Sequence, residues 1–399
     1  MIFIVKGGKL KIKFAHMGDC HLGGWRFPEL QELNMQSFAY ALDFCIKDKV
    51  DMVLITGDLF DSAYPSIEIL KRTFAEFKKL KDANIPCYLI AGSHDYSVSG
   101  KTFLEVLEHA GFCINTFKTE EKNEKIFLQP TIIKNFALYG YPGKKSSLEV
   151  QELRKTVLQD APGFFRIFML HTALKEAVGN MPIEAISIPE LPKADYYALG
   201  HLHVDFNKPN ICYSGPIYPN NFEELEELKH GQFYIVEIGN GNIIKQNKVP
   251  IKLKEVLSLN ISIENSLTAT EKILSELNKN NMQDKIVLLR LTGKLNEGKM
   301  SDIRFNEIEQ FAKDREVFVL VKSTSKLIFE EAEIKIESKD IHIVEENIIS
   351  TYFEKNPSKF SDKIPAMLNT LNIEKQEDEK NQIFQDRLIG DLQKILNFN

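Results

Sequence analysis

The stretch Met-Val-Leu-Ile-Thr-Gly-Asp-Leu-Phe-Asp at residues 52–61 joins a short apolar run directly to two carboxylates. Four other places share this design, with metal-ligand residues after an apolar run: Asp19-Cys20-His21 after 12–15, Gly92-Ser93-His94-Asp95 after 87–91, His171 after 167–170, and Gly200-His201-Leu202-His203 after 196–199. Continuous apolar runs of this length are typical of parallel strands buried on both faces. Because ligands collect beyond the carboxyl ends of such strands, we expect an α/β fold that brings the five segments to one edge.

The residue types in these segments indicate a site for two divalent cations. Five of the chain's nine histidines lie in them, together with aspartates, and no cysteine cluster accompanies them. Imidazole with carboxylate suits manganese, iron or zinc better than calcium or a soft-metal site. In two-metal phosphoesterases the cations lie about 3.5–4 Å apart, clamp a phosphate and activate water for an in-line displacement. We expect the two oxygens of Asp58 to bridge such a pair.

The remaining ligands can be divided between the two metals. The first metal is assigned to Asp19, His21, Asp58 and His203. The second metal is assigned to Asp58, His171 and His201, with Ser93 as a possible further ligand. His94 is left as a phosphate contact and as the proton donor to the leaving oxygen. Asp61, three residues after the bridging aspartate, is placed to hold His94 in its useful tautomer.

Each of these residues has a simpler interpretation when it is taken alone. The simpler roles are a satisfied buried histidine for His171, a metal-free strand-end pair for His201 and His203, and a turn or helix cap for Asp61. His16 lies within the first apolar strand, where we expect a structural role. Asp95 suits a cap of the following helix as well as a support for the site.

The motifs resemble those of the calcineurin-like metallophosphoesterases. Within that superfamily they are similar to the double-strand-break-repair nucleases, whose bacterial form is the SbcD exonuclease subunit. The resemblance is carried by Asp19-Cys20-His21-Leu22-Gly23, Gly57-Asp58-Leu59-Phe60-Asp61, Gly92-Ser93-His94-Asp95, His171, Tyr197-Ala198-Leu199-Gly200-His201-Leu202-His203 and Tyr213-Ser214-Gly215-Pro216. It covers roughly residues 10–240 in motif order and the rest in layout. It implies a metallophosphoesterase sandwich, with metal and proton-donor roles at the positions assigned above.

Ser93 departs from the pattern of this family, which usually has asparagine at that position. Asparagine offers an amide oxygen to the second metal and an N–H to the phosphate. A serine hydroxyl is shorter and is a poorer metal ligand. Either water completes the second metal's ligands or that metal is bound more weakly, and the simpler alternative makes Ser93 only a turn residue before His94.

Composition limits the class of protein. With 399 residues and 43% hydrophobic content, the chain can form two or three domains with proper cores. Its net charge of −6 gives no overall basic footprint, although bound metals can supply local positive charge for DNA. The five scattered cysteines are expected to be free thiols in a reducing cytosol. We expect no membrane segment and a cytoplasmic location, nucleoid-associated in a prokaryote.

The chain is expected to have three parts. They are a metallophosphoesterase (nuclease) domain at 1–250, a small α+β capping domain at 251–337, and a C-terminal helical region at 338–399. Gly239-Asn240-Gly241-Asn242 predicts a hairpin turn between strands at 233–238 and 243–248. The capping domain is expected to run strand, helix, strand, helix, strand, at 256–263, 269–277, 286–291, 303–312 and 317–321. Apolar residues recur at helical spacing in 341–352 and 384–396.

Partners follow from the resemblance. In the family the capping domain helps to grip DNA, and the C-terminal helices dock on the coiled-coil base of an SMC-like ABC ATPase of the SbcC type. The alternatives are a plain stabilising domain and helices that pack back onto the chain's own domains. The family also forms homodimers, through helices that correspond here to residues 67–80 and 102–110.

The function predicted from these features is a manganese-dependent nuclease, with magnesium, iron or zinc as other candidates for the two metals. It would process double-stranded and hairpin DNA ends, as an exonuclease and endonuclease in double-strand-break repair. One alternative is another phosphodiesterase or phosphatase that acts on small nucleotides or phosphoproteins. A second is a DNA-end-binding scaffold for the ATPase, in which Ser93 has weakened catalysis.

Overall fold

The computed structural model describes residues 11–329, except 98 and 180, and residues 363–373, 375, 379 and 381–396. The chain divides into two compact units, Met1–Ile328 and Phe329–Asn399. Each unit is described by itself.

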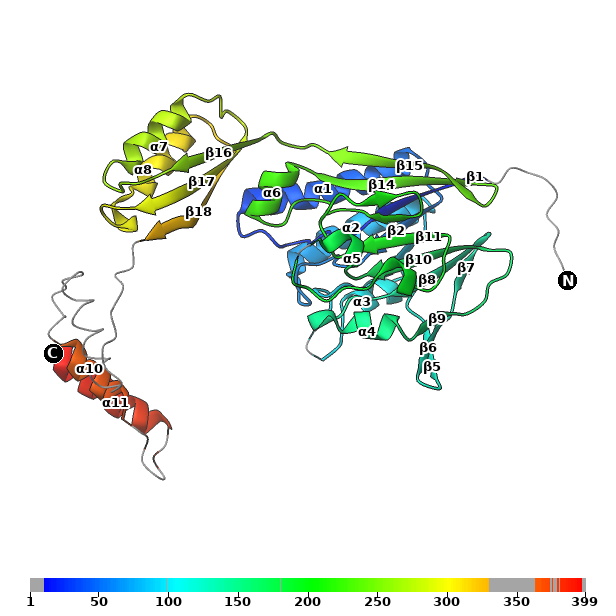
Figure 1. Ribbon diagram of the computed structural model, residues 1–399, viewed down its shortest axis with the longest axis horizontal. Helices are drawn as coiled ribbons and strands as arrows, with labels where there is room; N and C mark the ends of the chain where they lie inside the picture. The colour runs from blue at the N-terminus through cyan, green and yellow to red at the C-terminus, as the bar shows by residue number, and fades with distance from the viewer. Residues whose placement is uncertain are drawn as a thin grey trace. The chain divides into compact units, whose positions relative to one another are not determined.

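Two six-stranded sheets form the centre of the first unit (Figure 1). One has the order β15-β14-β1-β2-β3-β4, with β1 Lys11–Met17, β2 Met52–Thr56, β3 Cys87–Ile90, β4 Ile114–Asn115, β14 Gly231–Gly239 and β15 Asn242–Ile251. The other has the order β12-β13-β11-β10-β8-β7, with β7 Thr131–Ile133, β8 Phe136–Tyr141, β10 Phe165–His171, β11 Tyr196–Gly200, β12 Asn207–Lys208 and β13 Ile211–Tyr213. The expected sandwich is confirmed, and the five motif-bearing strands are divided between its sheets: β1, β2 and β3 are parallel neighbours in one, and β10 and β11 in the other.

The alternation of side chains along each strand produces four layers. Phe14 and Leu54 from the first sheet meet Ile167 and Tyr196 from the second in a shared core between the sheets. The outer face of the first sheet is covered by α1 Pro28–Lys47, α2 Ile67–Asp82 and α3 Leu104–His109, and that of the second by α4 Leu148–Leu153 and α5 Lys175–Val178. Since both faces of each sheet are buried, the strands need apolar residues at successive positions, as the sequence has them.

Shorter elements complete this part of the chain. A small sheet contains β5 Thr119–Lys122, β6 Lys125–Leu128 and β9 Thr156–Leu158, and the remaining helices are η1 Lys145–Ser147, η2 Ile188–Glu190 and α6 Phe222–Leu228. The predicted hairpin is confirmed: β14 pairs with β15 in antiparallel register, and the turn residues Asn240 and Gly241 have φ angles of 54° and 74°.

Residues 252–329 form a three-stranded sheet with two helices, in the element order that the sequence predicted. The elements are β16 Val256–Ser262, α7 Ala269–Asn278, β17 Ile286–Leu295, η3 Met300–Asp302, α8 Phe305–Asp314 and β18 Val319–Phe329. Ile286 and Val319 pack in one core with Trp25 and Leu30 of the sandwich. Arg290 on β17 is 2% exposed and pairs with Glu226 on α6 at 2.7 Å.

The second unit contains α10 Ile364–Leu371 and α11 Asn381–Leu396 among its described residues. The helix predicted at 384–396 is therefore confirmed. The helical pattern at 341–352 lies outside the described residues. The domain boundaries at 250/251 and 337/338 stay predictions.

Two other expectations can be compared with the structure. All five cysteines are free and buried. Among the described residues, no helix is both long and apolar enough to cross a membrane.

His16 on β1 joins the two sheets in the interior. Its side chain is fully buried, with Nδ1 3.0 Å from the Tyr196 hydroxyl and Nε2 3.2 Å from the Leu199 carbonyl oxygen. Burial lowers the pKa of His16 to about 3, against a partial opposing effect of the Leu199 hydrogen bond. The imidazole therefore stays neutral in the folded protein, which agrees with a structural role.

This buried histidine predicts acid sensitivity. In the unfolded chain His16 takes up a proton near its ordinary pKa of about 6.5, so the unfolded state binds more protons as the pH falls. The wild type should lose about 2 kcal/mol relative to His16→Gln between pH 7.5 and pH 5. Urea unfolding of both proteins across this range measures the difference. Parallel pH profiles would contradict the assignment of a neutral, buried His16.

Candidate metal centre

The loops that follow β1 and β2 are held together by their backbones. The Asp19 N–H donates to the Gly57 carbonyl oxygen at 3.0 Å, and the His21 N–H donates to the Asp58 carbonyl oxygen at 3.0 Å. These bonds fix two metal-ligand motifs side by side at the edge of the first sheet. The motifs at His171 and His201, which are far away in the sequence, reach the same place from β10 and β11 of the second sheet.

Four site residues have a left-handed backbone. The φ angles are 50° for Asp19, 42° for His21, 48° for Asp58 and 98° for His201. This conformation is uncommon for residues other than glycine, and it costs about 1–3 kcal/mol where the surroundings enforce it. Such residues occur in three of the five motifs. The surrounding fold therefore holds these side chains in place although the backbone conformation is locally unfavourable.

Close approach explains the glycine before Asp58. Gly57 has a φ angle of 92°, and a Cβ atom there would lie 2.3 Å from Nδ1 of His171. Any larger residue would push the His171 ring away from the site. Glycine is thus needed before Asp58 so that His171, from the other sheet, can pack against this loop.

Three buried or largely buried histidines are oriented in the same way, by an acceptor at Nδ1. The pairs are His21 with Asp61 Oδ1 at 3.2 Å, His203 with Glu224 Oε2 at 2.9 Å, and His171 with the Thr56 carbonyl oxygen at 2.9 Å. A carboxylate or carbonyl oxygen can only accept, so each Nδ1 must carry the proton. In the neutral ring this leaves Nε2 with a free lone pair. Histidines that bind metals are typically held this way.

The free nitrogens point at one another and at a carboxylate. Nε2 of His21 and Nε2 of His203 are 3.2 Å apart, and Nε2 of His171 is 3.2 Å from Oδ2 of Asp58. Two lone pairs at such a distance repel unless a proton or a cation lies between them. Nε2 of His171 is buried and has no hydrogen-bond partner in the described part of the chain. The residues therefore fit bound metal, because a cation between His21 and His203 and another between His171 and Asp58 would satisfy all three nitrogens.

Asp58 is the carboxylate that the nitrogens share. Its Oδ2 lies 3.2 Å from Nε2 of His171 and 3.8 Å from Nε2 of His21, so one oxygen faces both halves of the cluster. Its Oδ1 accepts the backbone N–H of His94 at 2.8 Å. This hydrogen bond leaves a second lone pair on Oδ1, so a bridge through both oxygens of Asp58 stays a prediction.

Asp19 approaches the cluster beneath the histidines. Its carboxylate is fully buried and accepts the His201 N–H at 2.9 Å, while its Oδ1 lies 4.0 Å from Nε2 of His203 and 3.8 Å from Nδ1 of His171. In the described part of the chain, three sets of potential ligand atoms each lie within 4.8 Å of one another: Asp19 with His21 and His203, His21 with Asp58 and His94, and Asp19 with Asp58 and His171. The buried His and Asp clusters are consistent with a two-metal site.

The electrostatics of the cluster favour positive charge. Burial raises the pKa of Asp19. Burial also acts on His171, but the Asp58 and Asp19 carboxylates outweigh it and raise the pKa of His171 to about 10. Burial lowers the pKa of His201 to about 3, which keeps its ring neutral and able to act as a ligand. Two buried carboxylates thus attract a proton in the protein alone, and a cation would compete with that proton.

His94 lies at the open side of the cluster. Its side chain is 46% exposed, and its ring is 4.8 Å from the His21 ring. The sequence predicted that Asp61 would hold His94. The closer contact comes from the Asp61 main-chain oxygen, 2.8 Å from Nδ1 of His94, while the Asp61 Oδ1 lies 3.9 Å from the same nitrogen. The Asp61 carboxylate instead contacts His21 and accepts from Nδ2 of Asn220 at 2.9 Å. The difference arises because His21 lies closer to that carboxylate.

His201 and Ser93 line a cavity rather than the tight cluster. The His201 ring is 5.1 Å from the His171 ring, and His201 belongs to none of the three sets of close histidine and aspartate atoms in the described residues. His201 and Ser93 face a cavity of about 500 Å³ together with His94. The cavity places open space directly beside the candidate metal ligands.

The sequence did not indicate two residues that organise the site, Glu224 and Asn220, and it left two roles open for a third, Asp95. Glu224 holds His203, Asn220 holds Asp61, and the buried Asp95 accepts backbone N–H groups from Gly92 at 2.9 Å and Phe60 at 3.1 Å. Burial, with the charge of Asp58, raises the pKa of Asp95 to about 6. Of the two roles considered for Asp95, support of the site agrees with these bonds.

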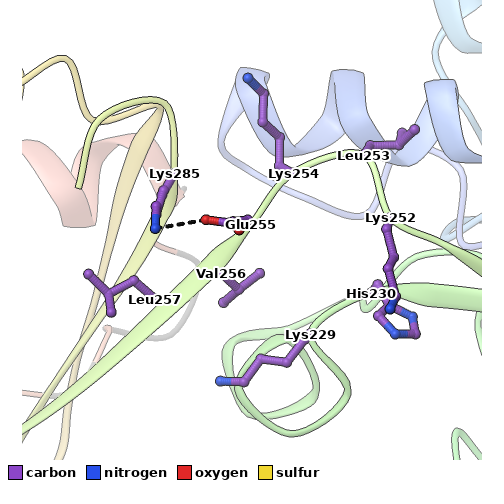
Figure 2. Close-up of a pocket in the computed structure, with 9 residues that line it drawn as sticks. All are labelled: Lys229, His230, Lys252, Leu253, Lys254, Glu255, Val256, Leu257 and Lys285. Carbon is purple, nitrogen blue, oxygen red and sulfur yellow. Dashed lines mark ion pairs between the residues drawn. The ribbon is translucent and has the colours of Figure 1, made fainter. Parts of the chain in front are cut away.

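A separate cavity of about 530 Å³ lies between α6 and the start of the 252–329 sheet (Figure 2). It is lined by Lys229, His230, Lys252, Leu253, Lys254, Glu255, Val256, Leu257 and Lys285. Lys285 pairs with Glu255 at 2.7 Å, and Figure 2 shows the four lysine side chains pointing in different directions. None of the candidate metal ligands lines this cavity, so its lysines form a diffuse basic surface rather than a catalytic centre.

Comparison with known families identifies the sandwich. Residues 12–205 match the calcineurin-like phosphoesterase family. This segment is a calcineurin-like metallophosphoesterase domain. The α/β metallophosphoesterase fold expected from the motifs is therefore confirmed. The described Asp and His cluster lies within the matched segment, while Glu224, which contacts His203, lies beyond it.

Relatives of the phosphoesterase domain are distant. The chain is 29% identical to the uncharacterized metallophosphoesterase YhaO of Bacillus subtilis over 58% of this chain and 59% of that protein. It is 28% identical to the DNA double-strand break repair protein Mre11 of Methanocaldococcus jannaschii, over 65% of this chain and 72% of that protein. It is 25% identical to the protein of the same name from Archaeoglobus fulgidus, over 82% of this chain and 78% of that protein.

Glu224 provides a test of the metal centre that leaves the cluster residues unchanged. Glu224→Gln removes the charge that orients His203 and should weaken Mn²⁺ binding by about 10–100-fold, the usual effect of losing such a partner. Isothermal titration calorimetry of metal-stripped protein measures the affinity. Glu227→Gln, an exposed change on the same helix, is the control and should bind Mn²⁺ as the wild type does. Equal affinity of both variants would contradict a metal at His203.

Proposed function

We propose that this chain is a metal-dependent nuclease that hydrolyses phosphodiester bonds at DNA ends in double-strand-break repair. The observation that carries the proposal is the convergence of the Nε2 atoms of His21 and His171 on the buried Asp58 carboxylate, with Nε2 of His203 3.2 Å from that of His21. The proposal is supported by two matched relatives that are named as DNA double-strand break repair proteins and that align with 65% and 82% of this chain.

In this proposal the two metals are held by both sheets of the sandwich. One metal would be bound by Asp19, His21, Asp58 and His203, and the other by Asp58, His171 and His201, with Ser93 beside it. Mn²⁺ is the proposed ion, because this ligand set suits it and the cluster is open on the side of His94. When bound, the pair would supply an activated water and offset the charge of the phosphate.

His94 is proposed to protonate the leaving oxygen. The Nδ1–H of His94 donates a hydrogen bond to the Asp61 main-chain oxygen, so a proton for the substrate must come from Nε2 of His94. The backbone N–H of His94 is meanwhile bound to Asp58, which keeps the loop at the edge of the cluster. His94 can therefore meet the substrate from the exposed side while the buried residues hold the metals.

The positive charge that could contact a DNA backbone is confined to part of the surface. The whole chain carries a net charge of −6. The cavity of Figure 2 has four lysines against one glutamate, and Lys252 has no ion pair among the described residues. This surface supports a contact between residues 252–329 and phosphates, a contribution that would fall with rising salt.

The proposed protein partners are an SMC-like ABC ATPase of the SbcC type and a second copy of this chain. The ATPase would dock on the C-terminal helices, of which α10 and α11 are described. For the dimer, side-chain exposure decides which apolar residues of 67–80 and 102–110 can lie at an interface. Leu70 and Phe74 pack against the protein's own core, whereas Ile67 and Val106 are 77% and 46% exposed.

Asp58 gives the first test of the proposed function. Wild-type protein should cleave end-labelled DNA with Mn²⁺, and Asp58→Asn should abolish cleavage and reduce bound metal to one ion or none, because the shared oxygen loses its charge. Asp43→Asn, an exposed change on α1, is the control. Cleavage of small phosphodiesters but not of DNA by the wild type would favour another phosphoesterase. An active Asp58→Asn protein with two metals would contradict the assignment of the bridge.

His94 separates chemistry from metal binding. His94→Ala should keep the metal content of the wild type and lose about 10²–10⁴-fold in cleavage rate, the usual contribution of general acid catalysis. Metal analysis and single-turnover cleavage give the two values. If the metal is lost together with the rate, His94 is a ligand, as its proximity to His21 and Asp58 also allows.

The dimer is tested with charges at the exposed apolar positions. Ile67→Asp with Val106→Asp should yield a monomer at micromolar concentration, since one substitution acts twice across a two-fold axis. Multi-angle light scattering measures the mass, and cleavage of a small phosphodiester reports on the intact site. A wild-type protein that is already monomeric without DNA or ATPase would remove the dimer from the proposal.

A further inference from the structure

The cavity of about 500 Å³ beside the metal cluster has two kinds of wall. His94 and His201 form the wall toward the cluster. The other walls are formed by Asp61, Ser62, Ala63, Tyr64, Ser93, Tyr96, Ser97, Lys144, Lys145 and Ser147. Its volume lies within the range of about 300–1,000 Å³ that is common for small-ligand pockets. The cavity thus has space for part of a substrate next to the reacting phosphate.

Tyr64 is the most exposed of the cavity's aromatic residues. Its side chain is 71% exposed, and its ring has no aromatic or cation–π partner in the described residues. It lies on the loop between β2 and α2, six residues after Asp58, and this loop is fixed at its start by the backbone bond from His21 to Asp58. A large ring held in water beside a catalytic cluster gains most by covering a flat apolar surface.

Lys145 is, after Tyr64, the second side chain of the cavity that has no partner for its functional group in the described residues. Its neighbour Lys144 is paired with Glu152, whereas Lys145 has neither an ion pair nor a hydrogen bond among the described residues. Lys145 is exposed, lies in η1 and lines the same cavity as Tyr64. A free ammonium group and a free aromatic ring in one cavity match the phosphate and the base of a nucleotide.

We propose that this cavity binds the nucleoside next to the scissile phosphate, with its base stacked on Tyr64 and the adjoining phosphate paired with Lys145. The inference rests on the proposed nuclease function and adds its substrate class: a strand in which the base beside the cleaved bond is unpaired. A base within a duplex stacks on its neighbours, so it must leave the helix to reach Tyr64. Frayed, single-stranded or hairpin-loop DNA should then be preferred to blunt duplex.

The experiment is a double-mutant cycle between protein and DNA. Wild type, Tyr64→Ala and Tyr64→Trp are assayed with Mn²⁺ on a single-stranded oligonucleotide and on the same oligonucleotide with an abasic residue beside the cleaved bond. Removing either the ring or the base should lower kcat/KM by roughly 5–150-fold, the range for one lost base–aromatic stack. Removing both should cost little more than removing one. Tyr64→Trp should retain the activity of the wild type on the intact strand.

Controls keep the inference separate from the proposed function. Tyr40→Ala removes another exposed tyrosine, on α1, and should leave all rates unchanged. Bound Mn²⁺ should be equal in all variants. Failure of the wild type to cleave either DNA would overturn the nuclease proposal. A wild type that cleaves while Tyr64→Ala does so equally well, or additive effects of the two changes, would overturn stacking on Tyr64.

Lys145 is tested on the same substrates. Lys145→Ala should raise KM for the oligonucleotide and reduce the salt dependence of binding by about one phosphate contact. Lys145→Arg should restore most of the affinity. A loss of affinity that is equal at low and high salt would contradict a phosphate contact, and a changed oligomeric state of Tyr64→Ala would assign that ring to a protein interface instead.

Discussion

The site depends on the proton positions of three histidines. Thr56, Asp61 and Glu224 each present an acceptor to an Nδ1 atom, and this leaves the Nε2 lone pairs of His171, His21 and His203 directed inward. Without these acceptors the rings could reverse their tautomers, and the inward nitrogens would carry protons that oppose a cation. The orientation of each ring is thus set by a neighbour that is not itself a candidate ligand.

The arrangement of the two sheets makes one of these Nδ1 contacts possible. The acceptor for His171 is a main-chain oxygen at the end of β2, while His171 itself ends β10 of the other sheet. The ends of β2 and β10 must therefore lie within hydrogen-bond distance of each other, although they belong to different sheets. The core between them, with Phe14 against Tyr196 at 5.6 Å between ring centroids, and the buried His16 help to maintain this register. The left-handed backbone at Asp19, His21 and Asp58 costs conformational free energy locally.

The sequence predicted the strands and the ligand residues because each is a local pattern. The apolar run at 52–56 is a strand, and the metal-ligand residues come directly after it. The apolar runs did not predict which strands share a sheet, since pairing depends on contacts between distant strands, and the sandwich was expected from the family resemblance alone. The sequence did not indicate Glu224 either: the pair Asn221 and Glu224 has the spacing of a helix N-cap, and Asn221 does cap α6, so nothing local indicates the contact with His203. The Asp61 carboxylate lies 3.2 Å from Nδ1 of His21 and 3.9 Å from Nδ1 of His94, a small difference that no local sequence pattern encodes.

The most direct test of the two-metal centre is anomalous diffraction at the manganese edge from crystals grown with Mn²⁺. Two peaks should appear, one in contact with the Nε2 atoms of His21 and His203 and one in contact with Nε2 of His171, with Oδ2 of Asp58 next to both. The Nδ1 contacts to Asp61, Glu224 and Thr56 should be unchanged. A single peak, or peaks away from these nitrogens with the rings rotated, would contradict the account.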